Sequence, residues 1–337
     1  MTEKSVDPLS ARVLRIHPEP YEYISEAQVH AALTADPGAY LSFVEGMLKS
    51  IAEGRASLEH PPKLIFKDDS GKGDFRVMPC VIRHAAGVIK TVKVVGTNRT
   101  GTVVPDQITV GKAFRLHPED NYITHIYEAC LLSSARTGAC ATIALKYLAA
   151  LRRKITIVGA GRLAYYTALY ASALGGVEEI VFHDKQVQRA QAIVEWASRN
   201  LAGICCKVGG EGSIGRSDIA VFATTSTIPI CHPDDIEADL IISTGADAEE
   251  HRELDSGWAS RADVYVDVLD SAHVGDLRAW MVEGVISPAQ VIPLLRLLRE
   301  GPKEFTRPRV FISTGSAMFD NLTIAYLLDK ANQAQLG

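Results

Sequence analysis

The sequence has no long apolar run, no excess of basic residues and no paired cysteines, and each of these features argues against a class of protein. No apolar stretch reaches the roughly 20 residues that a membrane-spanning helix needs. Lys and Arg number 35 against 40 Asp and Glu, and the net charge of −5 gives no electrostatic case for nucleic acid or an anionic membrane. The first 20 residues have no apolar stretch before a small-residue cleavage site, so we expect a short tail leading into a strand, in a cytoplasmic protein.

The cysteines are scattered and form no C-x-x-C pair, which argues against a zinc site or a disulfide framework. We therefore expect no bound metal and reduced thiols that serve mainly in packing. They are Cys80, Cys130, Cys140, Cys205, Cys206 and Cys231.

The apolar patterns divide the 337 residues into two kinds of structure, and a chain of this length can hold two domains. Residues 26–53 have helical spacing, and 62–128 contain short β-like runs joined by turn residues, which predicts a meander. Residues 130–151 predict a long helix. A strand–helix alternation from 154 to about 312 has continuous apolar runs, typical of parallel strands buried on both faces, and a closing helix follows over 316–333.

The stretch "ITIVGAGRLA" at 155–164 predicts a dinucleotide-binding turn. Gly159-Ala160-Gly161-Arg162-Leu163-Ala164 fits G-x-G-x-x-G/A between a strand and a helix. In this motif the first glycine allows a tight bend and the second lets a pyrophosphate approach the backbone. The final small residue brings the helix close to the sheet. The free N–H groups and positive dipole end of the helix favour phosphate.

Asp184 indicates NAD as the cofactor. It ends the next apolar strand, "EEIVFHD", at the distance from the glycines where an acidic residue accepts the ribose hydroxyls and repels the 2′-phosphate of NADP. Lys185 beside it weakens that preference slightly.

Several motifs along the chain together resemble the ornithine cyclodeaminase/μ-crystallin family. They are "RVMPC" (76–80), "VKVVGTN" (92–98), "SSARTGACATIALKYLA" (133–149), "IVGAGRLA" (157–164), "SDIAVFATTS" (217–226), "ISTGAD" (242–247) with "REL" (252–254), and "STGSAMFD" (313–320). The resemblance implies an α/β fold, in which a Rossmann-type doubly wound parallel-sheet domain is inserted into a β-rich α+β domain that binds substrate and forms a homodimer. We expect residues 1–130 to form the first part of the substrate-binding and dimerisation domain. Residues 131–312 would form the NAD-binding domain, and 313–337 would return to the substrate domain.

The family's chemistry begins with hydride transfer between the Cα of an amino acid and a nicotinamide. In a cyclodeaminase the side-chain amine then attacks the iminium, ammonia leaves and the hydride returns. Dehydrogenases and imine reductases of alanine, cyclic ketimines or N-substituted amino acids of the siderophore type use part of this cycle, and a μ-crystallin-like protein binds without turnover. The resemblance implies an amino acid or imine partner and leaves these alternatives open.

Lys93 and Asp247 are the candidate catalytic residues. A partly desolvated lysine in the apolar strand "TVKVVG" would have a lowered pKa and could share a proton with substrate. Lys90 is three residues away, so in a regular strand it faces the opposite side. Asp247 follows the apolar strand "LIISTG", at the edge where ligands bind in α/β sheets, and could take a proton from the substrate amine or steer that amine toward the iminium carbon. The family's active-site lysine and aspartate match these two positions.

Further candidates come from the same matching. Arg136 interrupts a helix of small residues and could hold the substrate carboxylate. Thr224 would line the cofactor, while Ser313 and Thr314 would face the nicotinamide and substrate. Asp320 begins the closing helix, where an N-cap role is about as frequent as a functional one.

The chain departs from the family pattern at three places. Where an arginine after proline usually grips the carboxylate, it has "PPKLIFK", so Lys63 or Lys67 would supply the charge without the planar fork. His251 stands where a cofactor-contacting lysine is usual, and Arg162-Leu163 replace smaller or neutral residues in the glycine turn.

Overall fold

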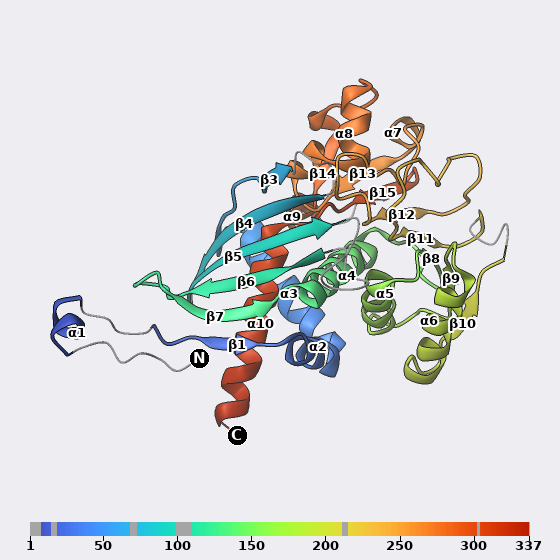
Figure 1. Cartoon of the computed structure of the whole chain (residues 1–337). Coiled ribbons are helices and arrows are strands. Elements are labelled where there is room, and N and C mark those ends of the chain that lie inside the picture. Colours follow the sequence, from blue (N-terminus) through green and yellow to red (C-terminus); the bar gives the residue numbers. More distant parts are fainter. Residues whose placement is uncertain are drawn as a thin grey trace.

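A computed structural model of the chain describes residues 8–14, 19–67, 73–98, 109–210, 215–301 and 304–336. Two sheets lie beside one another, and the helix α4 (Cys130–Leu148) connects them along the chain (Figure 1). The first 20 residues differ from the simple tail that we expected, because Pro8–Leu14 form the helix α1 before the strand β1. No helix in the described ranges is long and apolar enough to cross a membrane.

The first sheet has seven strands in the order β1-β7-β6-β5-β4-β2, with β3 also paired to β4. The pairing is antiparallel except between β1 and β7, so the predicted meander is confirmed across β4 to β7. The strands are β1 (Glu22–Ile24), β2 (Ser57–Glu59), β3 (Leu64–Lys67), β4 (Gly73–His84), β5 (Gly87–Asn98), β6 (Thr109–Leu116) and β7 (Ile123–Glu128).

The helix α10 (Ala317–Leu336) packs along β4 and β5 and is drawn in red in Figure 1. The buried side-chain amide of Asn321 donates to the carbonyl of Cys80 at 3.2 Å and to that of Ile89 at 3.0 Å. These bonds link the first turns of α10 to the sheet and thereby position its neighbour Asp320.

The single helix expected over 26–53 is in fact two helices, α2 (Glu26–Ala35) and α3 (Pro37–Ala52). Pro37 cannot donate a backbone hydrogen bond inside a helix, so the first helix ends before it. The Asp36 carboxylate then accepts from the Ala39 N–H at 2.8 Å and caps the second helix.

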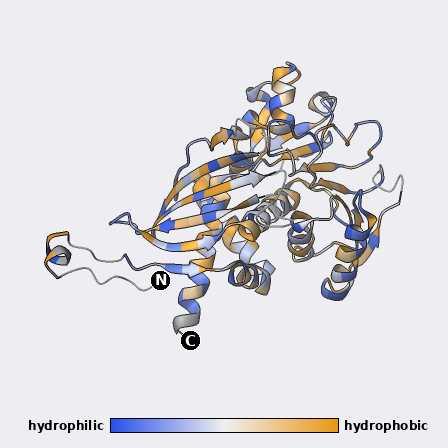
Figure 2. Ribbon diagram, viewed as in Figure 1, coloured by the Kyte–Doolittle hydropathy of each residue, from blue (hydrophilic) through white to orange (hydrophobic). Residues whose placement is uncertain are grey.

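The second sheet has eight strands in the order β10-β9-β8-β11-β12-β15-β13-β14, and every neighbouring pair is parallel. Alternate residues enter two separate apolar clusters, with Ile155 and Ile157 on one face and Val158 and Phe222 on the other. The sheet is therefore buried on both faces, as predicted, and its central strands are coloured hydrophobic in Figure 2. The strands are β8 (Lys154–Val158), β9 (Glu179–His183), β10 (Cys205–Val208), β11 (Ile219–Phe222), β12 (Leu240–Ser243), β13 (Asp263–Val266), β14 (Val291–Pro293) and β15 (Arg309–Ile312).

Three of these strands, β10, β14 and β15, were not anticipated from the sequence. Each is only three or four residues long, and the run of β15 begins with a charged residue, Arg309. The remaining helices are α5 (Arg162–Ser172), α6 (Val187–Asn200), α7 (Trp258–Arg261), α8 (Gly275–Val282) and α9 (Leu294–Glu300), with the 3-10 turns η2 (Leu269–His273) and η3 (Pro288–Gln290).

The strand order reverses beside β8, since β9 and β10 lie on one side of it and β11 and β12 on the other. In open parallel sheets such a reversal leaves a crevice at the carboxyl ends of the strands, where ligands bind. The glycine turn follows β8 directly, so the topology puts it at this crevice.

Candidate active site

A pocket of about 580 Å³ lies between the carboxyl edge of the eight-stranded sheet and the inner face of β3, β4 and β5. Its size is within the usual range for small-molecule sites. From the parallel sheet it is lined by residues that follow β8, β11 and β12. From the other sheet it is lined by alternate residues of three adjacent strands: Lys63, Ile65 and Lys67 at β3, Asp74, Arg76 and Met78 on β4, and Lys93, Val95 and Thr97 on β5.

The glycine turn has the conformation that its motif predicts. Gly159 has a φ of 97°, which favours glycine, and a Cβ there would overlap the Ala223 carbonyl oxygen. The helix α5 begins after Gly161 with no side-chain cap, and Gly161, Arg162 and Leu163 line the pocket. Uncapped N–H groups facing a pocket suit the phosphates of a dinucleotide.

Asp184 stands directly after β9, beside this turn. One carboxylate oxygen accepts from the Ala160 N–H at 2.8 Å, and the other accepts from the Gln186 N–H at 2.8 Å. Ala164 is fully buried, which lets α5 lie close to the sheet. The carboxylate therefore braces the turn in this structure, and its contact with a ribose stays a prediction.

Lys93, Arg136 and Asp320 form a buried charged cluster at the inner end of the pocket. The Lys93 ammonium, 1% exposed, donates to Asp320 Oδ1 at 2.7 Å and to Ser133 Oγ at 3.2 Å. The Arg136 Nε–H donates to the same carboxylate oxygen at 2.9 Å. Burial, and next the Arg136 charge, lower the pKa of Lys93 to about 7.

Asp320 is not the N-cap of the closing helix, which corrects that reading of the sequence. It lies in the first turn of α10, and the Ser316 hydroxyl oxygen accepts from the Met318 N–H near the helix start at 3.1 Å. The second oxygen of Asp320 is buried without a hydrogen-bond partner in the structure. A buried polar atom of this kind beside a pocket points to an additional donor, such as a water or ligand group.

Lys90 faces away from this cluster, as the odd spacing predicted. Its ammonium donates to the Asn121 side-chain oxygen at 2.6 Å near the surface. The alternation of β5 therefore directs Lys93 inward and Lys90 outward.

Asp247 faces the cluster from the loop after β12 and is held by an arginine from the opposite sheet. Arg76 on β4 is 5% exposed, and its Nη1 donates to Asp247 Oδ2 at 3.0 Å. The same guanidinium binds both oxygens of Asp74, at 2.8 and 3.0 Å. No role was predicted for Arg76 from the sequence, although it precedes Met78, Cys80 and Ile82 on the buried side of an alternating strand.

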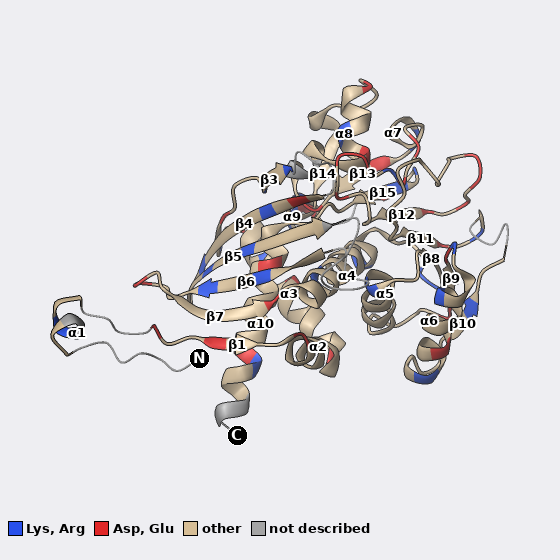
Figure 3. Cartoon of the chain, viewed as in Figure 1, with Lys and Arg blue, Asp and Glu red and all other residues tan. Residues whose placement is uncertain are grey.

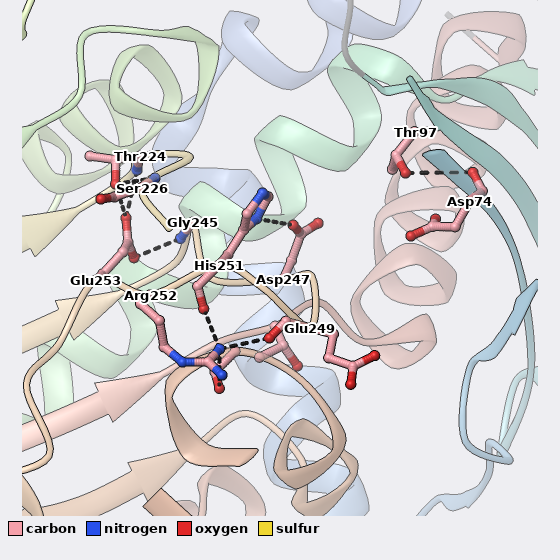
Figure 4. Close-up of polar contacts among 12 residues, drawn as sticks. Asp74, Thr97, Thr224, Ser226, Gly245, Asp247, Glu249, His251, Arg252 and Glu253 are labelled. Carbon is pink, nitrogen blue, oxygen red and sulfur yellow. Dashed lines mark hydrogen bonds and ion pairs between the residues drawn. The ribbon is translucent and has the colours of Figure 1, made fainter. Parts of the chain in front are cut away.

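The other oxygen of Asp247 lies 3.4 Å from His251 Nδ1, as Figure 4 shows. Burial opposes the charge of Asp247, but the Arg76 charge, followed by His251 and Lys63, outweighs it and holds the pKa of Asp247 well below its usual value. In turn the Asp247 carboxylate raises the pKa of His251.

The two candidate lysines of "PPKLIFK" lie at different depths. The Lys63 ammonium is half-buried and donates to the Thr314 carbonyl at 2.7 Å, while burial, and next the Arg76 charge, lower the pKa of Lys63 to about 8. Lys67 pairs with Glu249 at the pocket mouth, and its side chain is 69% exposed. Lys63 thus faces the interior, where Thr314 also lines the wall, and Lys67 forms part of the rim.

Glu253, of the "REL" motif, was also missed as a site residue. One of its buried oxygens accepts from the Thr224 N–H at 2.6 Å and the Thr224 hydroxyl at 2.9 Å, and the other accepts from the Gly245 N–H at 2.9 Å (Figure 4). It therefore fixes two adjacent strand ends that line the pocket. Ser313 is not part of the lining, since its buried hydroxyl donates to Asp267 behind the wall at 2.8 Å.

The cysteines pack largely as expected, because Cys80, Cys130, Cys140 and Cys231 are buried. Cys205 is exposed and Cys206 is partly exposed. Cys130 reaches the pocket wall, where its sulfur lies 2.9 Å from Nη1 of Arg162.

Comparison with known proteins agrees with this architecture over most of the chain. The model of the ornithine cyclodeaminase/mu-crystallin family matches residues 24–335. An alanine dehydrogenase of Archaeoglobus fulgidus is 27% identical over 325 residues, which cover 93% of this chain and 96% of that protein.

Two solved structures share the fold. The Δ1-pyrroline-2-carboxylate reductase of Thermococcus litoralis, in complex with NADH and L-proline, has a TM-score of 0.84 at 23% identity and covers 93% of this chain and 98% of its own. An archaeal alanine dehydrogenase dimer with bound NAD has a TM-score of 0.82 at 23% identity and covers 94% and 98%.

Proposed function

Because the chain belongs to the ornithine cyclodeaminase/mu-crystallin family, we propose that it transfers hydride between NAD and the Cα of an amino acid, through the imine. The observation that carries this proposal is one pocket whose lining includes an uncapped glycine turn and Asp247 from the eight-stranded sheet and the buried Lys93 from the opposite sheet. The family match over residues 24–335 confirms the resemblance read from the motifs.

The cofactor proposal follows from the crevice beside β8. The N–H groups at Gly161, Arg162 and Leu163 would bind the pyrophosphate, and the Arg162 guanidinium adds positive charge there. Thr224 would lie along the cofactor, and Asp184 would turn toward the ribose hydroxyls. Bound NAD and NADH in the two similar structures support this choice. When bound, the nicotinamide supplies or accepts the hydride.

The charges of the inner pocket favour a substrate carboxylate. Lys93 and Arg136 share the single carboxylate of Asp320, and the Lys63 ammonium donates to a carbonyl rather than to an acid. This surplus of positive charge can be balanced by the α-carboxylate of a substrate, held by Lys63 and Arg136. Figure 3 marks the charged residues of β4 and β5 that contribute to this wall.

Lys93 is placed to move the proton of the substrate nitrogen. Its pKa of about 7 lets it exist as ammonium or amine near neutral pH, so it can donate or accept a proton directly or through one water. Asp247, across the pocket, would stabilise the positive iminium that forms when the Cα loses hydride.

Three further carboxylates of the pocket lining, each with a cationic partner, favour a substrate whose side chain has no positive charge. Asp74 is held by Arg76, Asp247 by Arg76 and His251, and Glu249 by Lys67 and Arg278. A diamino acid would place its distal ammonium beside acids that already have cationic partners. We therefore favour an amino acid dehydrogenase or imine reductase over a cyclodeaminase acting on ornithine.

We propose a cytoplasmic homodimer as the working form, on the basis of the dimeric archaeal alanine dehydrogenase and the unpaired cysteines. The division into residues 1–130, 131–312 and 313–337 belongs to the same proposal. The two sheets support it, because their strands fall within 22–128 and 154–312.

A substrate panel tests the proposal. Alanine, proline, N-substituted glutamates, lysine, ornithine and diaminopropionate are assayed with NAD, and the corresponding imines with NADH. We expect NADH absorbance to rise with a monoamino acid and to fall with its imine. Ammonia from ornithine without net NADH would instead show a cyclodeaminase, and tight NADH binding without any turnover would show a binding protein.

A further inference from the structure

Arg76 connects the two sheets through the pocket. It extends from β4, where the Asp74 carboxylate holds its Nε and Nη2 in a fork, and its Nη1 reaches Asp247 on the loop after β12. A guanidinium that is 5% exposed and bound on one side by a fork has little freedom to leave its partner.

Asp247 has a basic side chain near each of its carboxylate oxygens. Arg76 Nη1 lies 3.0 Å from Oδ2, and His251 Nδ1 lies 3.4 Å from Oδ1. The Asp247 side chain is nevertheless 40% exposed, toward the pocket that it lines. The carboxylate is thus held from behind and remains open to a ligand.

We propose that Arg76 is a positioning residue that holds Asp247 as a fixed anion facing the substrate, so that Asp247 stabilises the iminium while Lys93 carries the proton. This inference rests on the proposed hydride-transfer reaction. It gives Asp247 an electrostatic role in place of the two roles expected from the sequence, proton acceptor or guide for the attacking amine.

The charged groups around Asp247 support an anion that does not exchange its proton. Arg76 faces it from β4, Lys63 from the segment before β3, and His251 from its own loop. The exposed His273, of η2, lines the same pocket.

The surroundings of Lys93 disfavour its charged form, whereas those of Asp247 favour its charge. Burial and the nearby Arg136 oppose the Lys93 charge, and Asp320 only partly offsets them. A group whose charged and neutral forms are close in free energy is the better proton carrier. Asp247 on one side of the pocket would therefore supply a fixed negative charge, and Lys93 on the other side would move the proton.

A carbon-13 NMR titration of the carboxyl groups tests the first half of the proposal without any substrate. The Asp247 resonance is assigned by its loss in Asp247→Asn. We expect it to remain that of a carboxylate throughout the range in which an ordinary aspartate titrates, about pH 3 to 5. Titration of wild-type Asp247 within that range would overturn the proposal.

The variant Asp74→Asn/Arg76→Met removes the fork and the cation together, so that no unpaired Asp74 charge remains. We expect its Asp247 resonance to titrate at higher pH than in the wild type. Its kcat/KM should also fall on the acid side of the pH profile as Asp247 becomes protonated. Because the carboxylate is no longer fixed, kcat/KM should fall by about 100-fold, with NADH affinity unchanged.

The matched control is Glu59→Gln/Arg83→Met, which removes an exposed ion pair between β2 and β4. It should leave both the titration and the pH profile as in the wild type. An unchanged Asp247 titration and pH profile in the Arg76 variant would contradict the proposal.

If the Arg76 variant does not fold, the wild-type titration still tests the fixed anion that the proposal requires, because titration of Asp247 between about pH 3 and 5 would overturn it. A protein that turns over no substrate on the panel but keeps Asp247 ionised would refute the proposed function and leave the hold of Arg76 on Asp247 intact.

Discussion

The seven-stranded and eight-stranded sheets face the same pocket and contribute different groups to it. The seven-stranded sheet provides buried charged side chains, Arg76 and Lys93, from the middle of long strands. The eight-stranded sheet provides the ends of short apolar strands, with a glycine turn, backbone N–H groups and Asp247 in a loop.

This difference indicates a division between chemistry and cofactor binding. Strand ends of a parallel sheet present backbone donors that suit phosphate and ribose in any dinucleotide enzyme. Side chains on an antiparallel sheet can change one by one without disturbing the pairing, so that wall can set the substrate and the proton transfer. Variants of the antiparallel wall should therefore affect turnover, and variants of the glycine turn on the parallel wall should affect NADH binding. Asp247 is the exception, since it lies on the parallel wall and has a proposed role in the reaction.

Lys93→Met should produce the largest loss of turnover. We expect kcat/KM to fall about 1,000-fold, the scale of general acid–base catalysis, with the dissociation constant of NADH unchanged. In the wild type, imine reduction needs the ammonium form and should decline as pH rises through about 7, the pKa of Lys93, whereas amine oxidation should increase. These limbs should be absent from the variant.

The control for that variant is Lys90→Met, on the outward face of the same strand. Stopped assays that measure turnover of both variants across pH compare the inward face of the strand with its outward face. A wild-type pH profile in Lys93→Met would show that the proton is carried elsewhere.

The glycine turn allows stability and cofactor binding to be separated. Gly161→Ala should fold normally, since a Cβ there would have no described atom within 4 Å, but should weaken NADH binding by about tenfold or more by obstructing the pyrophosphate. Gly159→Ala should instead destabilise the fold, because of its φ of 97° and the overlap with Ala223. Thermal unfolding and NADH titration distinguish the two outcomes, and equal effects of both variants on stability would argue against the assigned geometry.

Lys63→Met should raise KM for the substrate about tenfold with a smaller change in kcat, because the lost charge binds the carboxylate in ground and transition states alike. Lys67→Met, at the exposed rim, serves as the control and should change KM little. A larger effect of Lys67 than of Lys63 would place the carboxylate at the pocket mouth instead.

The smallest effect on activity is expected behind the eight-stranded sheet. The Ser243 hydroxyl lies 2.7 Å from Glu253 Oε2 and 3.0 Å from Asp276 Oδ2 but has one proton, so one of the two acids must be protonated. Burial, and next the Glu253 charge, raise the pKa of Asp276 to about 7. Asp276→Asn mimics the protonated acid, because its amide can donate to Ser243 while its oxygen accepts from the same backbone groups.

Because the folded-state pKa of Asp276 is above its unfolded value, its contribution to stability is fully present below about pH 4 and is lost as pH rises through about 7. Wild-type unfolding free energy should fall by on the order of 4 kcal/mol over that range. Asp276→Asn should show a flatter dependence in denaturant titrations. An equally steep decline of the unfolding free energy in the variant would show that Asp276 does not cause the pH dependence.

Local patterns predicted the parts of the site that depend on period and turn chemistry. The odd spacing of Lys90 and Lys93 placed them on opposite faces of the strand, and the family motif favoured Lys93 as the inward one. The glycine turn was recognised from the strand before it and the helix after it. Asp247 was placed at the pocket because it follows a buried parallel strand.

Such local patterns could not predict the contacts between segments that are distant in the sequence. Asp320 meets Lys93 only because Asn321 anchors α10 on the sheet, and Arg76 meets Asp247 only because two sheets face each other. Arg76 could have been suspected from its place on the buried side of β4, but its partner could not. The break at Asp36-Pro37 was readable from proline chemistry and was missed because the apolar spacing continues through it.

A crystal structure of the protein with NADH tests the central claim most directly. The account predicts the pyrophosphate against the N–H groups at 161–163 and the nicotinamide in the pocket between Lys93 and Asp247. A dinucleotide bound outside this crevice, or no binding at saturating NADH or NAD, would contradict it.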